Sequence, residues 1–197
     1  DAIAAGKVGQ VLAVAERLDT LAGIFAVGMK PSGNKDPFAL RRAALGLART
    51  LIEGGMDIDL RAALTEAFEM VPEAAFVAGV KPGKDGKPPV VDIGARRREL
   101  GDEVHAFVLE RLRGYYTDQG FSVDQFESVL AVAPATLPDF DRRLRAVGEF
   151  ARRSEATSLA AANKRVANIL RKQAEEAAAA PRDRKRTSLN ASHLGIQ

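Results

Sequence analysis

Residues 36–55 read Asp-Pro-Phe-Ala-Leu-Arg-Arg-Ala-Ala-Leu-Gly-Leu-Ala-Arg-Thr-Leu-Ile-Glu-Gly-Gly and carry the clearest helix signals in the chain. Asp36 has a side chain that caps helices, Pro37 suits a first helical turn, and the pair Gly54-Gly55 ends a helix. Between these signals apolar residues recur at three- and four-residue steps. The stretch therefore predicts one amphipathic helix with both ends marked.

Outward from this helix, the same spacing recurs on both sides, and no alternating run of strand length stands out. The predicted fold class is therefore all-α. The other helices are expected over residues 8–25, 60–71, 100–116, 122–132, 139–153 and 154–180.

Glycine and proline are dense over residues 77–94, which rules out a continuous helix there. We predict a linker; a short hairpin is the alternative, because Lys84-Asp85-Gly86 is turn chemistry. Two helical modules follow from this boundary, over 1–76 and 95–180. The polar run after Pro181 has no pattern, so residues 181–197 are expected to be a disordered or foreign tail.

The composition describes a chain of 197 residues with 46% hydrophobic and 28% charged content. Absence of cysteine excludes disulfides and thiolate metal sites and suits the cytoplasm. Charges interrupt every apolar stretch before the roughly 20 residues that a membrane helix needs, so no membrane association is expected. The first residues lack the pattern of a signal peptide and are typical of an interior cut.

The net charge of +3 conceals a division along the chain. Residues 51–76 hold six acidic side chains against one basic, whereas residues 141–172 hold nine basic against three acidic. A polyanion would prefer the second region.

The inventory of catalytic residues is poor. The two histidines, His105 and His193, are expected to be plain surface residues, and there is no phosphate loop of Walker spacing. Nucleophilic triads and multi-histidine metal sites have little to draw on. We therefore expect no catalytic centre, no bound cofactor and no metal in this chain.

Five stretches carry a family resemblance in order along the chain. They are Leu18-Asp-Thr-Leu-Ala-Gly-Ile-Phe-Ala, the Asp36–Gly46 run, Arg113-Gly-Tyr-Tyr-Thr-Asp-Gln-Gly-Phe, Pro138-Asp-Phe-Asp-Arg-Arg-Leu-Arg-Ala-Val and Ala161-Ala-Asn-Lys-Arg-Val-Ala-Asn-Ile-Leu. Together they resemble the β subunit of bacterial glycyl-tRNA synthetase over most of residues 8–172. The likeness stops before the family's final helices, so the second module is expected to be incomplete.

The resemblance implies an aminoacyl-tRNA synthetase, glycine-tRNA ligase, assembled from two α and two β subunits. In that family the α subunit performs the glycine and ATP chemistry, with Mg, in the cytoplasm. This chain would contribute tRNA recognition and support of the α subunit.

The first module resembles the end of an HD-type helical domain. True HD hydrolases hold metal through histidines and aspartates. The matching run Ala15-Glu16-Arg17-Leu18-Asp19 has Glu16 in the aspartate's place and no histidine nearby. A degenerate, structural HD fold is therefore expected.

Arg41 falls inside the apolar arc of the 38–52 helix, whereas Arg42 and Arg49 fall outside it. Burial of an unpaired guanidinium is costly, so Arg41 should be mostly buried with a carboxylate or several carbonyls as partners, Asp19 being preferred. Arg41, Arg42 and Asp19 are therefore structural or interface candidates; direct contact of Arg41 with RNA or another subunit is the alternative.

The second module resembles a helical anticodon-binding domain. Its last helix places Lys164, Asn168, Arg171 and Lys172 in one sector and its apolar residues opposite, so the apolar side should pack inward. Basic side chains neutralise phosphates, amides bond sugar or base edges, and tyrosines stack on unpaired bases. The predicted tRNA-binding residues are Arg142, Arg143, Arg145, Asn163, Lys164, Arg165, Asn168, Arg171, Lys172, Tyr115 and Tyr116.

Two alternative functions, each from a different class of protein, remain open. One is a fragment of a metal-dependent HD phosphohydrolase, which would need a histidine-aspartate dyad. The other is a helical interaction module whose basic face meets an acidic protein.

Overall fold

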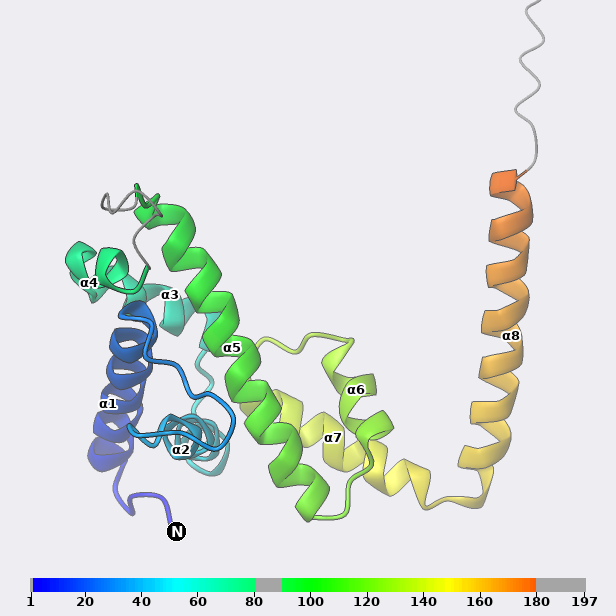
Figure 1. Ribbon diagram of the computed structural model, residues 1–197. Helices are drawn as coiled ribbons and strands as arrows, with labels where there is room; N and C mark the ends of the chain where they lie inside the picture. The colour runs from blue at the N-terminus through cyan, green and yellow to red at the C-terminus, as the bar shows by residue number, and fades with distance from the viewer. Residues whose placement is uncertain (1, 81–89, 180–197) are drawn as a thin grey trace, which may run out of the picture. The chain divides into compact units, whose positions relative to one another are not determined.

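The computed structural model describes residues 2–80 and 90–179 (Figure 1), and the predicted tail at 181–197 lies outside them. The described residues form α-helices and no named strand, which confirms the all-α prediction. The helices are α1 (Lys7–Ala26), α2 (Leu40–Glu53), α3 (Leu60–Met70), α4 (Glu73–Ala78), α5 (Ile93–Asp118), α6 (Val123–Leu130), α7 (Leu137–Ala151) and α8 (Ser154–Ala179).

The helix predicted from residues 36–55 is α2, and its end signals act as expected with one correction. The Asp36 carboxylate accepts hydrogen bonds from the backbone N–H groups of Leu40 and Arg41, at 2.8 and 3.0 Å. The helix begins at Leu40, so Pro37 lies in the preceding turn and not in the first helical turn. At the other end Gly55 has φ +60°, a conformation that favours glycine and ends the helix.

Two other helices have side-chain caps. The Asp92 side chain accepts from the backbone of Ala95 at 2.9 Å, which fixes the start of α5. At α6 the Ser122 and Gln125 side chains each bond the other's backbone N–H, which forms a capping box.

The core is built around α5, which contacts α1, α2, α3, α4 and α6 (Figure 1). Its buried residues recur every four residues and form one apolar face. The apolar side chains of the neighbouring helices pack against this face. Among the fully enclosed side chains are Leu21, Phe25, Leu40, Leu47, Leu51, Leu64, Phe68, Phe76, Leu100, Val104, Val108, Leu112, Tyr116, Phe126 and Phe140.

The division into compact units differs from the expected one. The contacts divide the chain into Asp1–Phe150 and Ala151–Gln197, whereas the expected boundary was the linker at 77–94. Helix α5 follows that stretch yet packs on α1 to α3, because the apolar face of α5 is covered by them. Residues 81–89, with the expected linker or hairpin turn, lie outside the described residues, and the helices on either side of them, α4 and α5, contact one another.

The first turns of helix α1 do not bury their valines. Val8 and Val11 are 85% and 58% exposed, whereas Gln10 and Val14 are buried. The Lys7 ammonium group donates to the carbonyl of Gly54, and the Gln10 amide donates to the carbonyl of Ala4. Polar bonds to the end of α2 and to the preceding segment set the orientation of this first turn.

Helix α4 was not predicted, and it lies against the end of α1 through backbone contact. Gly28 has φ +75°, and a Cβ on it would lie 2.9 Å from the carbonyl oxygen of Gly79. A Cβ on Gly79 would lie 2.1 Å from the carbonyl oxygen of Ala26. These two glycines therefore allow the ends of α1 and α4 to approach without side chains between them.

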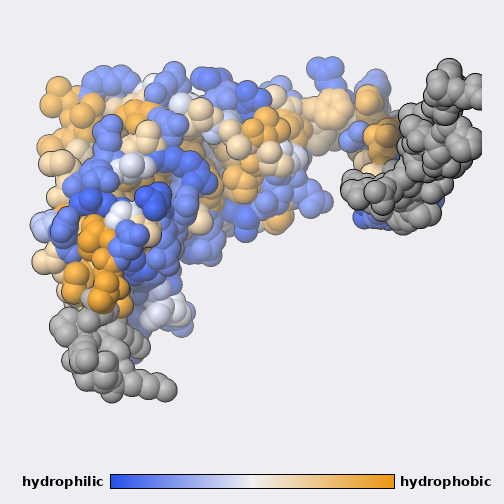
Figure 2. Space-filling model, turned by 90° about the horizontal axis from the view of Figure 1, so that it is seen from above, coloured by the Kyte–Doolittle hydropathy of each residue, from blue (hydrophilic) through white to orange (hydrophobic). Residues whose placement is uncertain are grey.

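Within the second unit, α8 is exposed along its length, apart from Ala156 and the side chains that are not described. No helix among the described residues has the length and apolarity to cross a membrane. On the face of the first unit seen in Figure 2, hydrophilic and hydrophobic residues are intermixed.

Candidate nucleic-acid interface

The basic face of α8, formed by Lys164, Asn168, Arg171 and Lys172, is exposed as predicted. These positions are separated by three, four or one residues, so they share one side of the helix. The ion pair of Arg171 with Glu175 spans 4.0 Å with both side chains about 70% exposed, so it holds Arg171 weakly. The neighbouring Asn163 and Arg165 are exposed too.

The apolar residues of α8 lie on the side of the helix opposite the basic face. Within the second unit, Leu159, Val166, Ile169 and Leu170 are 58%, 53%, 49% and 59% exposed. The sequence therefore predicted an amphipathic helix, and the inward packing of its apolar side stays a prediction.

The three arginines of α7 are less available than their sequence suggested. Arg142 and Arg143 lie 3.5 and 2.8 Å from the Asp139 carboxylate. Arg145 lies 2.9 Å from Asp141. The hydrogen bond from Arg143 lowers the pKa of Asp139 below its ordinary value, against a smaller opposing effect of desolvation. The α7 surface therefore combines basic and acidic groups, although all three arginine side chains remain at least half exposed.

Tyr116 is not available for base stacking, which corrects its place among the tRNA-binding candidates. Its side chain is 1% exposed, and its ring packs against Phe121, Phe126 and Phe140 at centroid distances of 5.6 to 6.3 Å. Its hydroxyl donates to Asp141 Oδ1 at 2.6 Å. Burial, and then this bond, raise the pKa of Tyr116 far above its ordinary value.

Tyr115 remains a candidate because it is only half-buried and lines an open groove. The guanidinium carbon of Arg49 lies 5.5 Å from its ring centroid. The groove has a volume of about 620 Å³ and runs between α2 and α5. It is lined by Arg41, Arg42, Leu45, Glu110, Arg111, Arg113, Gly114, Tyr115, Thr117 and Asp118.

Sequence reasoning missed Arg111 and Arg113 in this groove. Each carries an ion pair, Arg111 with Glu110 and Arg113 with Glu127. Each also stacks over an aromatic ring of the core, at 5.7 and 5.6 Å from the centroids. No local spacing indicated this groove, because it forms only where α2 packs on α5.

Arg41 has a different partner from the one expected. It is half-buried, and its Nη2 donates to the carbonyl of Gly33 at 2.6 Å. Asp19 is exposed and is not among its contacts in the described residues. Since α2 begins at Leu40, Arg41 lies in the first turn and its side chain reaches back over the preceding loop.

The described residues contain no group of three or more His, Cys, Asp or Glu side chains placed to hold a metal ion. His105 is half-buried and not a plain surface residue; burial and then Arg61 lower its pKa. His193 lies outside the described residues. The described residues thus define an all-α protein with exposed basic side chains on α7 and α8.

Comparison with known proteins then gives the family. The family model described as "Glycyl-tRNA synthetase beta subunit" matches residues 1–131. A glycine-tRNA ligase beta subunit of Xanthomonas campestris pv. campestris (strain B100) is 53% identical over 172 residues, covering 87% of this chain and 23% of the relative. The chain belongs to the glycyl-tRNA synthetase beta subunit family.

Two further relatives carry the same name. That of Xylella fastidiosa (strain Temecula1 / ATCC 700964) is 48% identical over 182 residues, covering 87% of this chain and 25% of the relative. That of Pseudomonas aeruginosa (strain LESB58) is 45% identical over 168 residues, covering 85% and 22%. The chain spans about a quarter of the length of these relatives.

Proposed function

We propose that this chain is a tRNA-contacting part of a glycine-tRNA ligase β subunit and that the basic face of α8 neutralises tRNA phosphates. The observation that carries the proposal is that Lys164, Arg171 and Lys172 project from one side of an exposed helix. Asn168 on the same side has an amide for sugar or base edges. Family membership supports tRNA as the polyanion.

In this proposal the chain supplies no reacting group. Glycine activation, with ATP and Mg, takes place on a partner α subunit in a cytoplasmic assembly of two α and two β subunits. The β subunit holds a distant part of the tRNA, which raises the rate at a separate centre through orientation. The chain alone should therefore show no glycine-dependent exchange of pyrophosphate into ATP, and exchange abolished by a point substitution in it would contradict the assignment.

Filter binding with tRNA over a salt series tests the basic face. The triple substitution Lys164→Ala, Arg171→Ala and Lys172→Ala should weaken binding and reduce the slope of log affinity against log salt by about two to three, since each lost phosphate contact removes somewhat less than one unit. Unchanged affinity with an unchanged slope would show that the face is only solvated.

A matched control removes three exposed cations of the first unit by Lys35→Ala, Arg61→Ala and Arg98→Ala. The net charge falls equally, so non-specific attraction to RNA weakens equally. A salt slope that changes only in the α8 variant assigns the phosphate contacts to that face.

A second candidate is a helical module that binds protein, and one observation favours it. The apolar side chains of Leu159, Val166, Ile169 and Leu170 are about half exposed on α8. Exposed apolar side chains gathered on one helix face are typical of protein contact. An acidic protein partner would lose affinity on Ile169→Ser and Leu170→Ser, whereas tRNA affinity would persist.

A further inference from the structure

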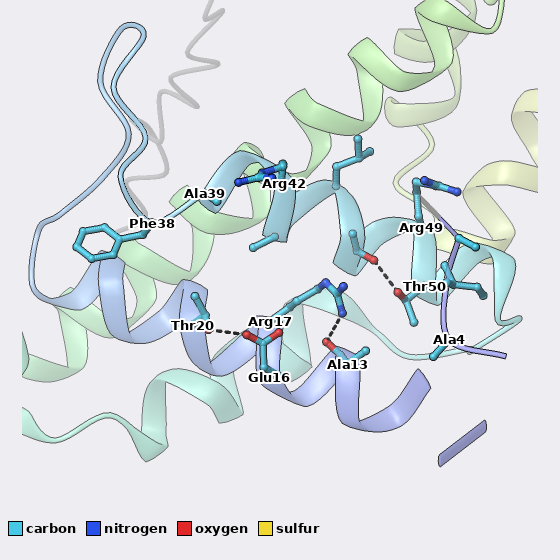
Figure 3. A pocket seen from close by; sticks show the side chains of 15 residues that line it. Ala4, Ala13, Glu16, Arg17, Thr20, Phe38, Ala39, Arg42, Arg49 and Thr50 are labelled. Carbon is cyan, nitrogen blue, oxygen red and sulfur yellow. Dashed lines mark hydrogen bonds between the residues drawn. The ribbon is translucent and has the colours of Figure 1, made fainter. Parts of the chain in front are cut away.

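A hollow between α1 and α2 contains Arg17, a partly buried arginine that an anion would stabilise. The hollow has a volume of about 530 Å³ and opens to solvent, with Arg17, Arg42 and Arg49 in its lining. The acidic residue in the lining is Glu16, which accepts a hydrogen bond from the Thr20 hydroxyl at 3.2 Å. Figure 3 shows the Arg17 side chain extending from α1 toward α2, across the hollow.

Arg17 is half-buried and has no carboxylate partner among the described residues. Its Nη1 donates to the carbonyl of Ala13 at 2.8 Å, and the other guanidinium donors make no protein hydrogen bond in the described part of the chain. A partly desolvated guanidinium with five donors is stabilised by an anion that accepts two of them at once. Phosphate oxygens have this geometry.

Gly46 makes room for this arginine. A Cβ at position 46 would lie 2.7 Å from Nε of Arg17 and 3.3 Å from Cζ. Glycine inside a helix is unfavourable relative to alanine, so its position here has a steric reason. The Thr50 hydroxyl, which donates to the Gly46 carbonyl at 2.7 Å, lies at the same wall of the hollow.

The other charged side chains around the hollow leave it with an excess of positive charge. Arg49 is bonded to Glu53 at 2.6 Å, and this bond raises the pKa of Arg49 above its ordinary value. Arg42 is exposed and makes no ion pair among the described residues. Arg17 and Arg42 thus outweigh Glu16, and the aromatic ring of Phe38, 43% exposed, lies at one end of the hollow (Figure 3).

We infer that this hollow is a binding site for a phosphate group, with Arg17 as the central ligand and Arg42 as the second cation. Gly46 is a positioning residue that keeps the guanidinium in place. The lining of this hollow includes no residue of α8. The phosphate belongs either to a free nucleotide or to an RNA backbone. In both cases the two arginines would bind the same phosphate oxygens.

Calorimetric titration of the 197-residue chain at constant ionic strength tests the site with three probes. They are inorganic phosphate, adenosine monophosphate and a short single-stranded RNA without terminal phosphates. Arg17→Ala should weaken binding of the responding probe about tenfold or more, because a charge-assisted bond pair is lost. A response to either small probe identifies a free phosphate, and a response to the RNA alone identifies a backbone phosphate.

Gly46→Ala is the sharper variant because it displaces the Arg17 guanidinium and changes no charge. It should weaken binding several-fold, whereas Gly23→Ala, whose Cβ meets nothing within 4 Å, should leave binding unchanged. Arg98→Ala, an exposed cation elsewhere in the first unit, should also be neutral. Arg42→Ala should weaken binding without affecting folding, so it decides the case if Arg17→Ala fails to fold.

The proposal is overturned if no probe binds, or if Arg42→Ala and Gly46→Ala bind the probe as tightly as the unaltered chain. The triple α8 variant should retain phosphate binding here. Loss of tRNA affinity in that variant with intact phosphate binding would therefore separate the two proposals.

Discussion

Helices α5 and α8 are each 26 residues long, yet their apolar residues have opposite surroundings. In α5 the side chains of Leu100, Val104, Val108 and Leu112 are 0% exposed, whereas the apolar residues of α8 are about half exposed. Both helices have an amphipathic pattern. Periodicity therefore shows which side of a helix is apolar, and only the rest of the fold shows whether that side is covered.

The largest expected effect tests this contrast directly. Leu112→Ala in α5 should lower the free energy of unfolding by about 2–5 kcal/mol, because it removes a buried side chain and leaves a cavity. Leu170→Ala in α8 should change it by less than about 0.5 kcal/mol, because that side chain is already exposed. Urea denaturation followed by circular dichroism measures both. Equal effects would mean that α8 is packed in solution.

A second prediction concerns the end of α5. Tyr116→Phe should lower the free energy of unfolding by about 1–3 kcal/mol, because the Asp141 carboxylate loses a buried hydroxyl donor. The folded state raises the pKa of Tyr116, so the protonated phenol is favoured by folding. That stabilisation is complete below the unfolded pKa near 10 and is lost as pH rises above it.

Denaturation at pH 9 and pH 11 checks the sign of this effect. The unaltered chain should lose stability between these values by more than Tyr116→Phe does. The matched control, Tyr115→Phe, retains the buried hydroxyl and should behave as the unaltered chain does. An identical loss in Tyr116→Phe would contradict the raised pKa, because it would show that folding does not change the titration of this phenol.

A third, smaller effect is expected at Arg41. Arg41→Ala should cost about 0.5–1 kcal/mol, because the hydrogen bond to the Gly33 carbonyl is exposed and no buried ion pair is broken. A buried pair with a carboxylate would have cost about 3–5 kcal/mol. Thermal denaturation distinguishes these values, with Arg42→Ala as the control that removes an exposed arginine without a hydrogen bond in the described residues.

The smallest effect belongs to the acidic partners on α7. The hydrogen bond from Arg143 lowers the pKa of Asp139, so the ionised carboxylate is favoured by folding. This contribution is present above the unfolded pKa near 3.9 and is lost as pH falls through the lower folded value. Asp139→Asn should therefore make unfolding slightly less pH-dependent below pH 4. A chemical-shift titration of the Asp139 carboxyl that gives an ordinary pKa would contradict this.

The sequence predicted the helices well because their local signals are complete. The capping box at Ser122, the Asp36 cap and the glycines after α2 each act within a few residues. Partners across the fold were predicted poorly, as Arg41 and Tyr116 show. Arg41 bonds a loop carbonyl instead of Asp19, because the helix starts later than the proline suggested. The acceptor of Tyr116 lies 25 residues away, on α7, where no local pattern indicates it.

Helical spacing alone predicts that the basic residues of α8 share one side of the helix, and their contact with tRNA stays a prediction. The α2–α5 groove and the hollow around Arg17 depend on tertiary packing, which joins arginines from helices far apart in sequence. The division into compact units also depends on long-range contacts, which pack α5 on α1, α2 and α3 and which glycine and proline in the sequence do not indicate.

The backbone contact between Gly28 and Gly79 has a consequence for substitutions. A Cβ on Gly79 would lie 2.1 Å from the carbonyl oxygen of Ala26, and a Cβ on Gly28 would lie 2.9 Å from the carbonyl oxygen of Gly79. The obstructing atoms belong to the backbone, so no flexible side chain can move aside. Alanine at position 79 should therefore separate the ends of α1 and α4.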